Sequence, residues 1–451
     1  MMLDALTPKV ALGASLLGGA AGVVGALAVL RKRSLMGDVL AHASLPGICL
    51  AYLLFNTRQL AVLSAGALFT GMLAVLLIAG ITRWTRTRED AAMGLALSVF
   101  FGAGVVLLTV IQQQARGNQA GLATYLFGEI AALRSRDVVL LAAVAAVLLT
   151  LVVAFYKELK TLSFDSQFAQ SQGWPTFTLD VALMSGVAVV TVVGLPVCGV
   201  ILMAAMLILP CVAARFWSNR FGMVLVLSGL IGLTTAVAGV LSAAPGEGLA
   251  WLPIRSLTLG MPPGPLIVLS GAGAFVVSAL FAPERGMVAR TLRLVRMRTR
   301  IATDHVLRLL FEAAEGKPQQ DAYGSLSAIT GRMSASRLTK WLVVWQAKRG
   351  GLLEVDGDRA RLTGTGLTAA ARLVRTHRLW ELFLVQHADI AADHVHRSAD
   401  DIEHMLPADL VDNLEDILRA EGRLPEVVGE PAVPTSPHVI TKSPPALPGR
   451  G

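Results

Sequence analysis

Long apolar runs alternate with short polar connections along the first 283 residues. A helix needs about 20 apolar residues to cross the hydrocarbon core of a bilayer. The approximate ranges of the runs are 9–30, 37–56, 60–81, 91–111, 137–156, 178–195, 197–214, 222–243 and 264–282. Gly13, Gly18, Gly22 and Gly25 predict close helix packing in the first run. The pattern therefore predicts an all-α polytopic membrane domain of about nine transmembrane helices.

The positive charges of the connecting loops predict the orientation of these helices. Arginine and lysine are concentrated after the first, third, fifth, seventh and ninth spans, in the segments 31–33, 83–88, 157–160, 215–220 and 285–296. Short loops rich in these residues stay on the cytoplasmic side. We therefore expect the N-terminus outside, every residue after 283 in the cytoplasm, and the protein in the plasma (inner) membrane.

Residues from 284 onward have the pattern of a soluble, mainly helical region. Helical spacing resumes at 301–314, and short strands flank Asp356-Gly357 as in a hairpin. A helix followed by a small hairpin is typical of a winged helix-turn-helix. The predicted organisation is a membrane domain (1–285), a basic linker (286–300), a small cytoplasmic winged-helix-like domain (301–366), a helical domain (367–425) and a Pro-rich disordered tail (426–451).

The composition agrees with a membrane protein and narrows its function. The chain is 54% hydrophobic and 16% charged, unlike an ordinary soluble domain. Its net charge of +8 lies largely beside the apolar runs, where it sets orientation, so it does not by itself indicate nucleic acid binding. No G-x-x-x-x-G-K-[ST] phosphate loop occurs in the sequence. We therefore expect a chain that is not an enzyme and that depends on a separate ATPase for energy.

An acid and an imidazole stand near the start of the second apolar run, in SLMGDVLAHASLPGICLAYLL (34–54). Asp38 and His42 are four residues apart, so on a helix they share a face and can bind one divalent metal through an oxygen and a nitrogen. Ionisable residues inside apolar runs usually mark an ion or substrate path. The alternative is a helix-stabilising Asp–His contact. Pro46 and Gly47 are expected to break or kink the helix just beyond the pair.

This segment resembles the signature of the membrane permease of manganese, zinc and iron ABC importers, the ABC-3 type. Further segments match that family in order, at 87–108, 125–130, 163–175, 197–215 and 264–286. The resemblance implies that Asp38 and His42 line the metal path. It implies three partners: a second permease in a homodimer or heterodimer, an extracytoplasmic metal-binding protein, and an ABC ATPase subunit. It also implies that the ATPase docks on Phe164, Asp165, Phe168 and Gly173.

A second cluster of imidazoles and carboxylates lies between residues 374 and 410. Helical offsets of four residues within it suit a metal site, although charged helices also produce them by chance. The segment resembles the metal-binding and dimerisation domain of diphtheria-toxin-repressor-type, iron- or manganese-dependent regulators. By that resemblance the candidate ligands are His377, Glu381, His396, Asp400, Glu403, His404 and His305. Asp400 stands where iron-type members have a thiolate, and a hard oxygen ligand favours manganese.

The same resemblance places a DNA-recognition helix near residues 334–348. Ser336, Arg337 and Lys340 would then lie toward phosphates or bases. Trp341 and Trp345 have core-like spacing and are expected to pack inside. The segment upstream of this helix is a poor helix-turn-helix scaffold. Two outcomes stay open: a domain that binds DNA, and a domain that keeps the fold without binding an operator.

Together these features predict the permease subunit of an ABC importer for a divalent transition metal, manganese first and then zinc or iron, with a fused cytoplasmic metal-sensing domain. The metal is the substrate and also the candidate regulatory ligand. The alternative function is a membrane-tethered, metal-dependent transcriptional regulator whose permease domain no longer transports. A simpler alternative for the fusion is a domain that stabilises the permease dimer without sensing metal.

Overall fold

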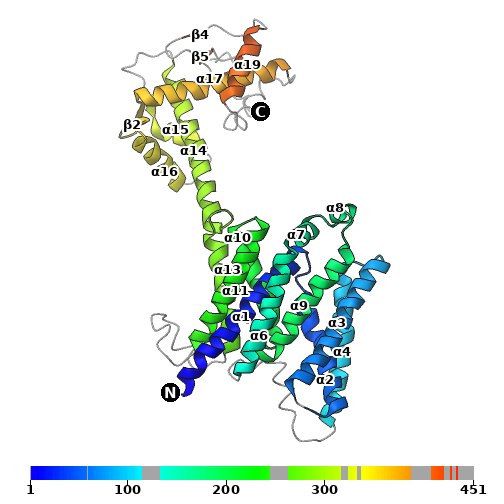
Figure 1. The fold of residues 1–451 in the computed structure, drawn as a ribbon. Coiled ribbons are helices and arrows are strands. Elements are labelled where there is room, and N and C mark those ends of the chain that lie inside the picture. The colour runs from blue at the N-terminus through cyan, green and yellow to red at the C-terminus, as the bar shows by residue number, and fades with distance from the viewer. Residues whose placement is uncertain are drawn as a thin grey trace, which may run out of the picture. The chain divides into compact units, whose positions relative to one another are not determined.

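The structure is a computed structural model, and the chain divides into two compact units, Met1–Arg290 and Thr291–Gly451. Figure 1 shows helices in both units and a small amount of strand in the second. The structure describes residues 2–57, 59–113, 133–243, 263–315, 323–332, 337–387, 408–420, 427–428 and 433–434.

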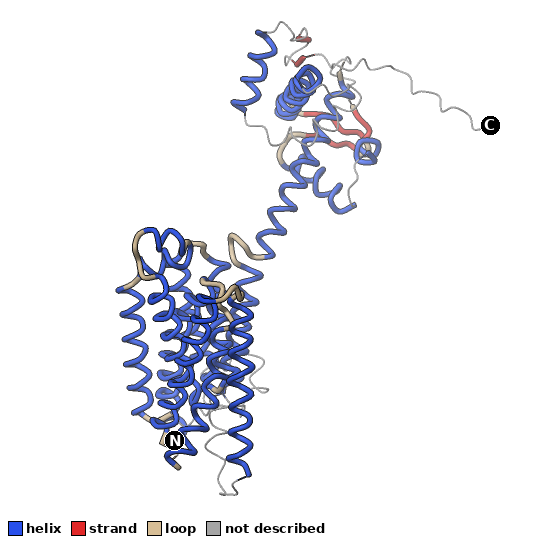
Figure 2. The backbone as a smooth tube through the Cα atoms, turned by 90° about the vertical axis from the view of Figure 1, so that its right-hand side faces the viewer, coloured by secondary structure: helices blue, strands red, loops and turns tan. Residues whose placement is uncertain are grey.

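The first unit is a bundle of long apolar helices joined by short connections. Its long helices are α1 (Met2–Leu30), α2 (Met36–Phe55), α3 (Leu60–Trp84), α4 (Glu89–Gln113), α6 (Ser135–Ala154), α9 (Thr176–Cys198), α10 (Val200–Trp217), α11 (Phe221–Ala243) and α13 (Pro263–Phe281). Two short helices, α7 (Tyr156–Phe164) and α8 (Ser166–Ser171), separate α6 from α9. The N-terminus lies at one end of this bundle and α7 and α8 lie at the other (Figure 1). Figure 2 shows the long helices running side by side between these ends.

Eight helices in the described part of the chain are long and apolar enough to cross a membrane. This confirms the all-α polytopic architecture. The ninth predicted run, 197–214, corresponds to α10, whose apolar stretch Leu202–Trp217 is shorter than the other eight. Gly199, with a φ of 79°, separates α9 from α10 and fixes where α10 begins.

Glycines bring α1 and α11 into close contact. A Cβ added at Gly18 would collide with the carbonyl oxygen of Gly232, and one added at Gly22 would collide with that of Ser228. Helices in a bilayer associate largely through such close backbone packing, because lipid offers no hydrophobic driving force between them. The predicted packing role of the glycines in the first run is therefore confirmed at these two positions.

Large apolar side chains also cover the outside of the first unit. Phe69 on α3 is 69% exposed, Val106 on α4 is 64% exposed and Val153 on α6 is 76% exposed. Monomeric soluble proteins rarely expose contiguous apolar surface of this kind. The outer surface is therefore suited to contact with lipid chains.

The second unit is small and mainly helical. It begins within α14 (Met287–Ala314), so the segment predicted as a linker, 286–300, is helical from its second residue onward. Its other elements are α15 (Leu326–Arg332), α16 (Arg337–Arg349), α17 (Gly364–His387), α19 (Ala408–Ala420), β1 (Gly324–Ser325), β2 (Leu353–Asp356), β3 (Arg359–Leu362), β4 (Val427–Val428) and β5 (Val433–Pro434).

Three of these strands form an antiparallel sheet in the order β1-β3-β2. The hairpin of β2 and β3 turns at Gly357 and Asp358, one residue later than predicted, because Asp356 is still paired with Arg359 in the sheet. Gly357 has a φ of 60° in this turn. The sheet shares a core with α14, α16 and α17, formed by Val306, Leu310, Val343, Leu353, Ala360 and Ala370. β4 and β5 pair with each other at the start of the segment predicted to be disordered, 426–451.

Candidate functional sites

Asp38 and His42 lie in the first two turns of α2. The Nε2 atom of His42 is 3.5 Å from the Oδ1 atom of Asp38, and the two side chains are 29% and 39% exposed, respectively. The rings of His42 and Phe101 on α4 meet edge to face, with centroids 4.9 Å apart. The structure therefore places the predicted oxygen and nitrogen ligands together on one helix face, with both side chains accessible.

The sequence predicts a break or a kink at Pro46. A break is wrong, because α2 continues through Pro46 and Gly47 to Phe55. Gly47 packs so closely on α3 that a Cβ there would collide with the carbonyl oxygen of Gly66. This packing supports the helical path across the proline. Pro46 has no N–H, so the carbonyl of His42 lacks the donor that a helix normally supplies four residues later. That carbonyl is a further oxygen on the residue that supplies the imidazole.

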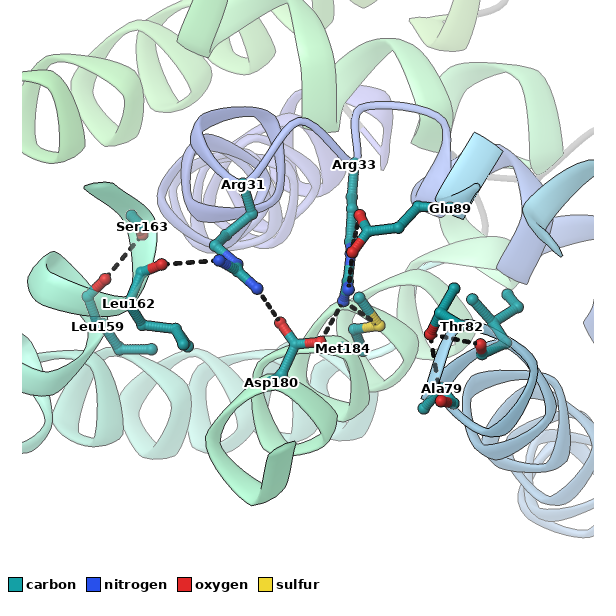
Figure 3. A network of polar contacts seen from close by, with 11 residues as sticks. Arg31, Arg33, Ala79, Thr82, Glu89, Leu159, Leu162, Ser163, Asp180 and Met184 are labelled. Carbon is teal, nitrogen blue, oxygen red and sulfur yellow. Dashed lines mark hydrogen bonds and ion pairs between the residues drawn. The ribbon is translucent and has the colours of Figure 1, made fainter. Parts of the chain in front are cut away.

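A network of charged side chains lies directly before α2 (Figure 3). Arg33, whose side chain is 6% exposed, donates from Nε to Oε2 of Glu89 at 2.8 Å and from Nη1 to Oδ2 of Asp180 at 2.5 Å. Arg31 donates from Nη2 to Oδ1 of the same Asp180 at 2.8 Å, and from Nη1 to the carbonyl oxygen of Leu162 at 2.7 Å. The network therefore connects the α1–α2 corner to α4, α9 and α7.

The sequence pattern predicts only an orienting role for Arg31 and Arg33 and does not reveal this network. Burial disfavours the charge of Arg33, but its hydrogen bond to Glu89 and the attraction of Asp180 outweigh burial and raise the pKa of Arg33 above its ordinary value. A signal for the network is present in the sequence. Glu89 and Asp180 stand at the starts of two apolar runs, where a carboxylate is costly without a partner.

The segment predicted to dock on an ATPase forms α7, α8 and the turn after them. Phe164 and Phe168 are 65% and 52% exposed. Asp165 caps α8, because its Oδ1 accepts a hydrogen bond from the N–H of Phe168 at 2.8 Å. Gly173 follows α8 with a φ of 81°, a conformation that favours glycine. Two of the predicted residues thus present aromatic surface, and the other two shape the backbone around them.

In the second unit, His377 and Glu381 form a buried polar cluster with Arg308. Their side chains are almost fully buried, and Nε2 of His377 lies 3.0 Å from Oε1 of Glu381. Nδ1 of His377 lies 3.0 Å from Nη1 of Arg308. A guanidinium group can only donate, so in a neutral His377 the Nδ1 atom accepts and Nε2 carries the proton toward Glu381. The structure therefore brings two predicted metal ligands together beside a cation.

The remaining predicted ligands of this unit are described only in part. His305 is half-buried on α14. Four others lie outside the described residues, namely His396, Asp400, Glu403 and His404. Among the residues that the structure does describe, no group of three or more His, Cys, Asp or Glu side chains is placed to hold a metal ion. His305, His377 and Glu381 are accordingly the described part of the predicted ligand set, and His377 and Glu381 are in contact.

The helix predicted to contact DNA is α16, and the side chains that it exposes differ from those predicted. Arg337 is exposed and Lys340 is half-buried, whereas Ser336 lies outside the described residues. Trp341 and Trp345 are 62% and 47% exposed, so the prediction that they pack inside is wrong. The side chains that α16 buries are Val343 and Ala347. The opposite face of the helix meets the core.

Comparison with known proteins gives matches for both units. Residues 3–282 match the ABC 3 transport family, and residues 363–426 match the iron dependent repressor, metal binding and dimerisation domain. The chain is 36% identical over 420 residues to the manganese transport system membrane protein MntC of Bacillus subtilis (strain 168), covering 93% of each chain. It is 37% identical over 285 residues to the zinc transport system membrane protein TroC of Treponema pallidum (strain Nichols), covering 63% of this chain and 92% of the relative.

A solved structure resembles the membrane unit. PsaBC from Streptococcus pneumoniae in complex with Fab has 31% sequence identity and a TM-score of 0.52, over 64% of this chain and 94% of that chain. The matches confirm the resemblances seen in the sequence and the multi-pass membrane character. The chain therefore belongs to the ABC 3 transport family, as a membrane component that is not an enzyme, and it carries a C-terminal metal-binding and dimerisation domain of the iron-dependent repressor type.

Proposed function

We propose that the chain is the permease subunit of an ABC importer for a divalent transition metal, with manganese as the first candidate, then zinc, then iron. The observation that carries this proposal is the contact between Asp38 and His42 on α2, within a chain of the ABC 3 transport family. The substrate order is supported by two relatives, one a manganese transport protein and one a zinc transport protein.

The geometry of the pair suits transient binding of the ion. One carboxylate oxygen and one imidazole nitrogen are ligands that borderline divalent metals accept. Two protein side chains leave the other coordination positions to water, to the carbonyl of His42, or to the second permease of a homodimer or heterodimer. An ion held by so few protein ligands is released readily, as passage requires. The partial exposure of Asp38 and His42 supports access of the ion.

The α7–α8 segment is the proposed docking surface for the ABC ATPase, through Phe164 and Phe168. Arg31 bonds the carbonyl of Leu162 near the end of α7 and shares Asp180 with Arg33, which lies shortly before Asp38. A movement of α7 can therefore be transmitted to the start of α2 through Arg31, the carboxylate of Asp180 and Arg33. An extracytoplasmic metal-binding protein is the proposed donor of the ion on the other side.

The second unit is proposed to be a cytoplasmic metal sensor, with the N-terminus of the chain on the outer side. Its proposed ligands are His377, Glu381, His396, Asp400, Glu403, His404 and His305. The three-stranded sheet beside α15 and α16 supports a winged-helix-like arrangement. Contact of Ser336, Arg337 and Lys340 with DNA remains a prediction.

Metal uptake tests the proposed path directly. The chain is expressed with its ATPase and binding protein in cells that lack their own importers, and manganese and zinc accumulation are measured. Asp38→Ala and His42→Ala should each reduce uptake by about tenfold or more, since even loss of an outer-shell partner of a metal typically costs that much. Competition between the two ions identifies the substrate.

The matched control is Asp90→Ala, which removes an exposed carboxylate from the first turn of α4. Its uptake should equal that of the unaltered protein at the same membrane abundance. Unchanged uptake in both Asp38→Ala and His42→Ala would refute the proposed path. No uptake by the unaltered protein would refute transport itself and favour a membrane-tethered regulator.

A further inference from the structure

The exposed face of α16 carries a strip of large apolar side chains. Leu338 is 75% exposed, Trp341 is 62% exposed and Trp345 is 47% exposed. Their spacing of three and four residues places them on one side of the helix. The indole rings stack with centroids 6.3 Å apart and planes 18° from parallel. The strip therefore presents a continuous aromatic and aliphatic surface to the outside of the unit.

Positive charge surrounds this strip. The guanidinium group of Arg349 lies over the ring of Trp345, 5.1 Å from its centroid. Every charged residue of α16 is a cation: Arg337, Lys340, Lys348 and Arg349. Helices that lie in the headgroup region of a bilayer combine tryptophan and leucine on one side with lysine and arginine at the border. The exposed face of α16 therefore has the composition of a helix that binds an anionic membrane surface.

The first half of α14 carries the same chemistry directly after the last candidate span, which ends at Phe281. Residues 285–303 contain six arginines and no aspartate or glutamate. Among them, Leu292, Val295 and Met297 are 51%, 43% and 56% exposed. Basic clusters immediately beside a transmembrane helix are attracted to anionic lipids. The first half of α14 therefore also has the composition of a segment that binds anionic lipid headgroups, independently of α16.

We propose that the C-terminal unit binds the anionic lipid headgroups of its own membrane through the exposed face of α16 and the first half of α14. A second copy of the chain is a poorer occupant, because it would bring like charges together. DNA is a poorer occupant because base edges are read by polar side chains, whereas the centre of this face is Leu338, Trp341 and Trp345. The covalent link to the spans keeps the unit at high local concentration near headgroups.

Hydrogen exchange of the full chain in lipid nanodiscs tests this proposal. Discs of phosphatidylcholine alone are compared with discs that also contain phosphatidylglycerol, and exchange is followed in peptides covering 337–349. Exchange in α16 should be slower in the anionic discs, and high salt should remove the difference. Equal exchange in both kinds of disc would overturn the proposal.

Two variants locate the effect. Lys348→Gln with Arg349→Gln should reduce the protection in anionic discs by about tenfold or more, given the attraction of each cation to an anionic surface. Trp341→Ser with Trp345→Ser should remove it while leaving exchange in neutral discs unchanged. The matched control, Arg372→Gln, removes an exposed cation from α17 and should keep the full protection. Protection of α16 by added DNA in neutral discs, or only when two chains share one disc, would contradict the lipid assignment.

Discussion

At the scale of single residues, Arg308 contacts His377 at a ring nitrogen that a metal ion could otherwise bind. Its Nη1 atom lies 3.0 Å from Nδ1 of His377, while the other ring nitrogen faces Glu381. Both ring nitrogens of His377 are therefore engaged, and one contact must be given up before the imidazole can bind metal. The guanidinium group also offsets the buried charge of Glu381, which would otherwise be costly. Metal binding at this point would thus exchange one cation for another.

Arg308→Gln should strengthen manganese binding at the cytoplasmic site by about tenfold or more, because it removes a positive charge in hydrogen-bond contact with a ligand. Calorimetric titration of the full chain measures this affinity. The protein should also carry Asp38→Ala, so that the proposed path does not contribute. Arg378→Gln is the control, since Arg378 lies next in sequence but bonds Glu315 at 2.7 Å. Equal affinity in the Arg308 variant and the control would show that no competition occurs.

Local residue spacing predicts some of these contacts and fails for others for identifiable reasons. Asp38 and His42 could be predicted to meet, because their offset of four residues brings them together on any helix. Arg31 and Asp180 could not, since 149 residues separate them and only the packing of α1 against α9 brings them together. The prediction that the tryptophans of α16 are buried fails for another reason. Periodicity shows which residues share a helix face, but it does not show which face packs against the core. The smaller Val343 and Ala347 fit against the core instead.

At the scale of elements, the contact between α1 and α11 depends on missing side chains. Gly22→Val should destabilise the membrane unit by about 1–3 kcal/mol or more, because the added atoms collide with the backbone at Ser228. Gly94→Val on α4 is the control, since nothing lies within 4 Å of a Cβ there. Thermal unfolding in detergent compares the two. Equal midpoints would contradict the close approach of α1 and α11.

The corner between α1 and α2 supports a second prediction at this scale. Asp180→Asn keeps the shape of the side chain but removes the charge that both Arg31 and Arg33 contact. If the network transmits movement of α7, metal imported per ATP hydrolysed should fall by about a hundredfold or more, because loss of one partner from a buried ion pair costs about 3–5 kcal/mol. ATP hydrolysis by the assembled transporter should continue. Uptake and hydrolysis are measured together in reconstituted vesicles.

Asp90→Asn serves as the control for this experiment, because it neutralises an exposed carboxylate at the start of α4. A parallel loss of uptake and hydrolysis in Asp180→Asn would indicate misfolding or lost docking instead of lost transmission. Unchanged uptake would mean that the network only holds the corner in place.

Elements themselves follow closely from the sequence wherever the pattern is local. The apolar runs are found as helices, and the hairpin is found with its turn one residue later than predicted, at Gly357 and Asp358. Arginine is a good helix former, so α14 begins at Met287, before the helical spacing that the sequence shows from residue 301. The division between α9 and α10 is also predicted, at residue 196, three residues before Gly199, where the structure has it.

At the scale of the whole molecule, one chain carries two candidate metal sites in separate units. The alignment with the Bacillus subtilis relative spans 420 residues, so the similarity extends beyond the membrane unit into the second. If the second site lies on the side where the ion is delivered, its occupancy reports how much metal has already been imported. Such a site can limit further uptake only if the ion has different affinity for the active and the restrained state of the transporter.

Uptake in metal-loaded cells tests this coupling. Manganese uptake by the unaltered protein should fall as cytoplasmic manganese accumulates, whereas Glu381→Gln, Asp400→Ala and Glu403→Ala should keep the initial rate. The difference should be about fivefold or more, the lower end of typical coupling between two sites. Asp416→Asn is the control, because its side chain is 75% exposed on α19 and outside the predicted ligand set. Equal inhibition in every variant would show that the second unit does not sense the ion, and would leave it the simpler role of stabilising the permease dimer.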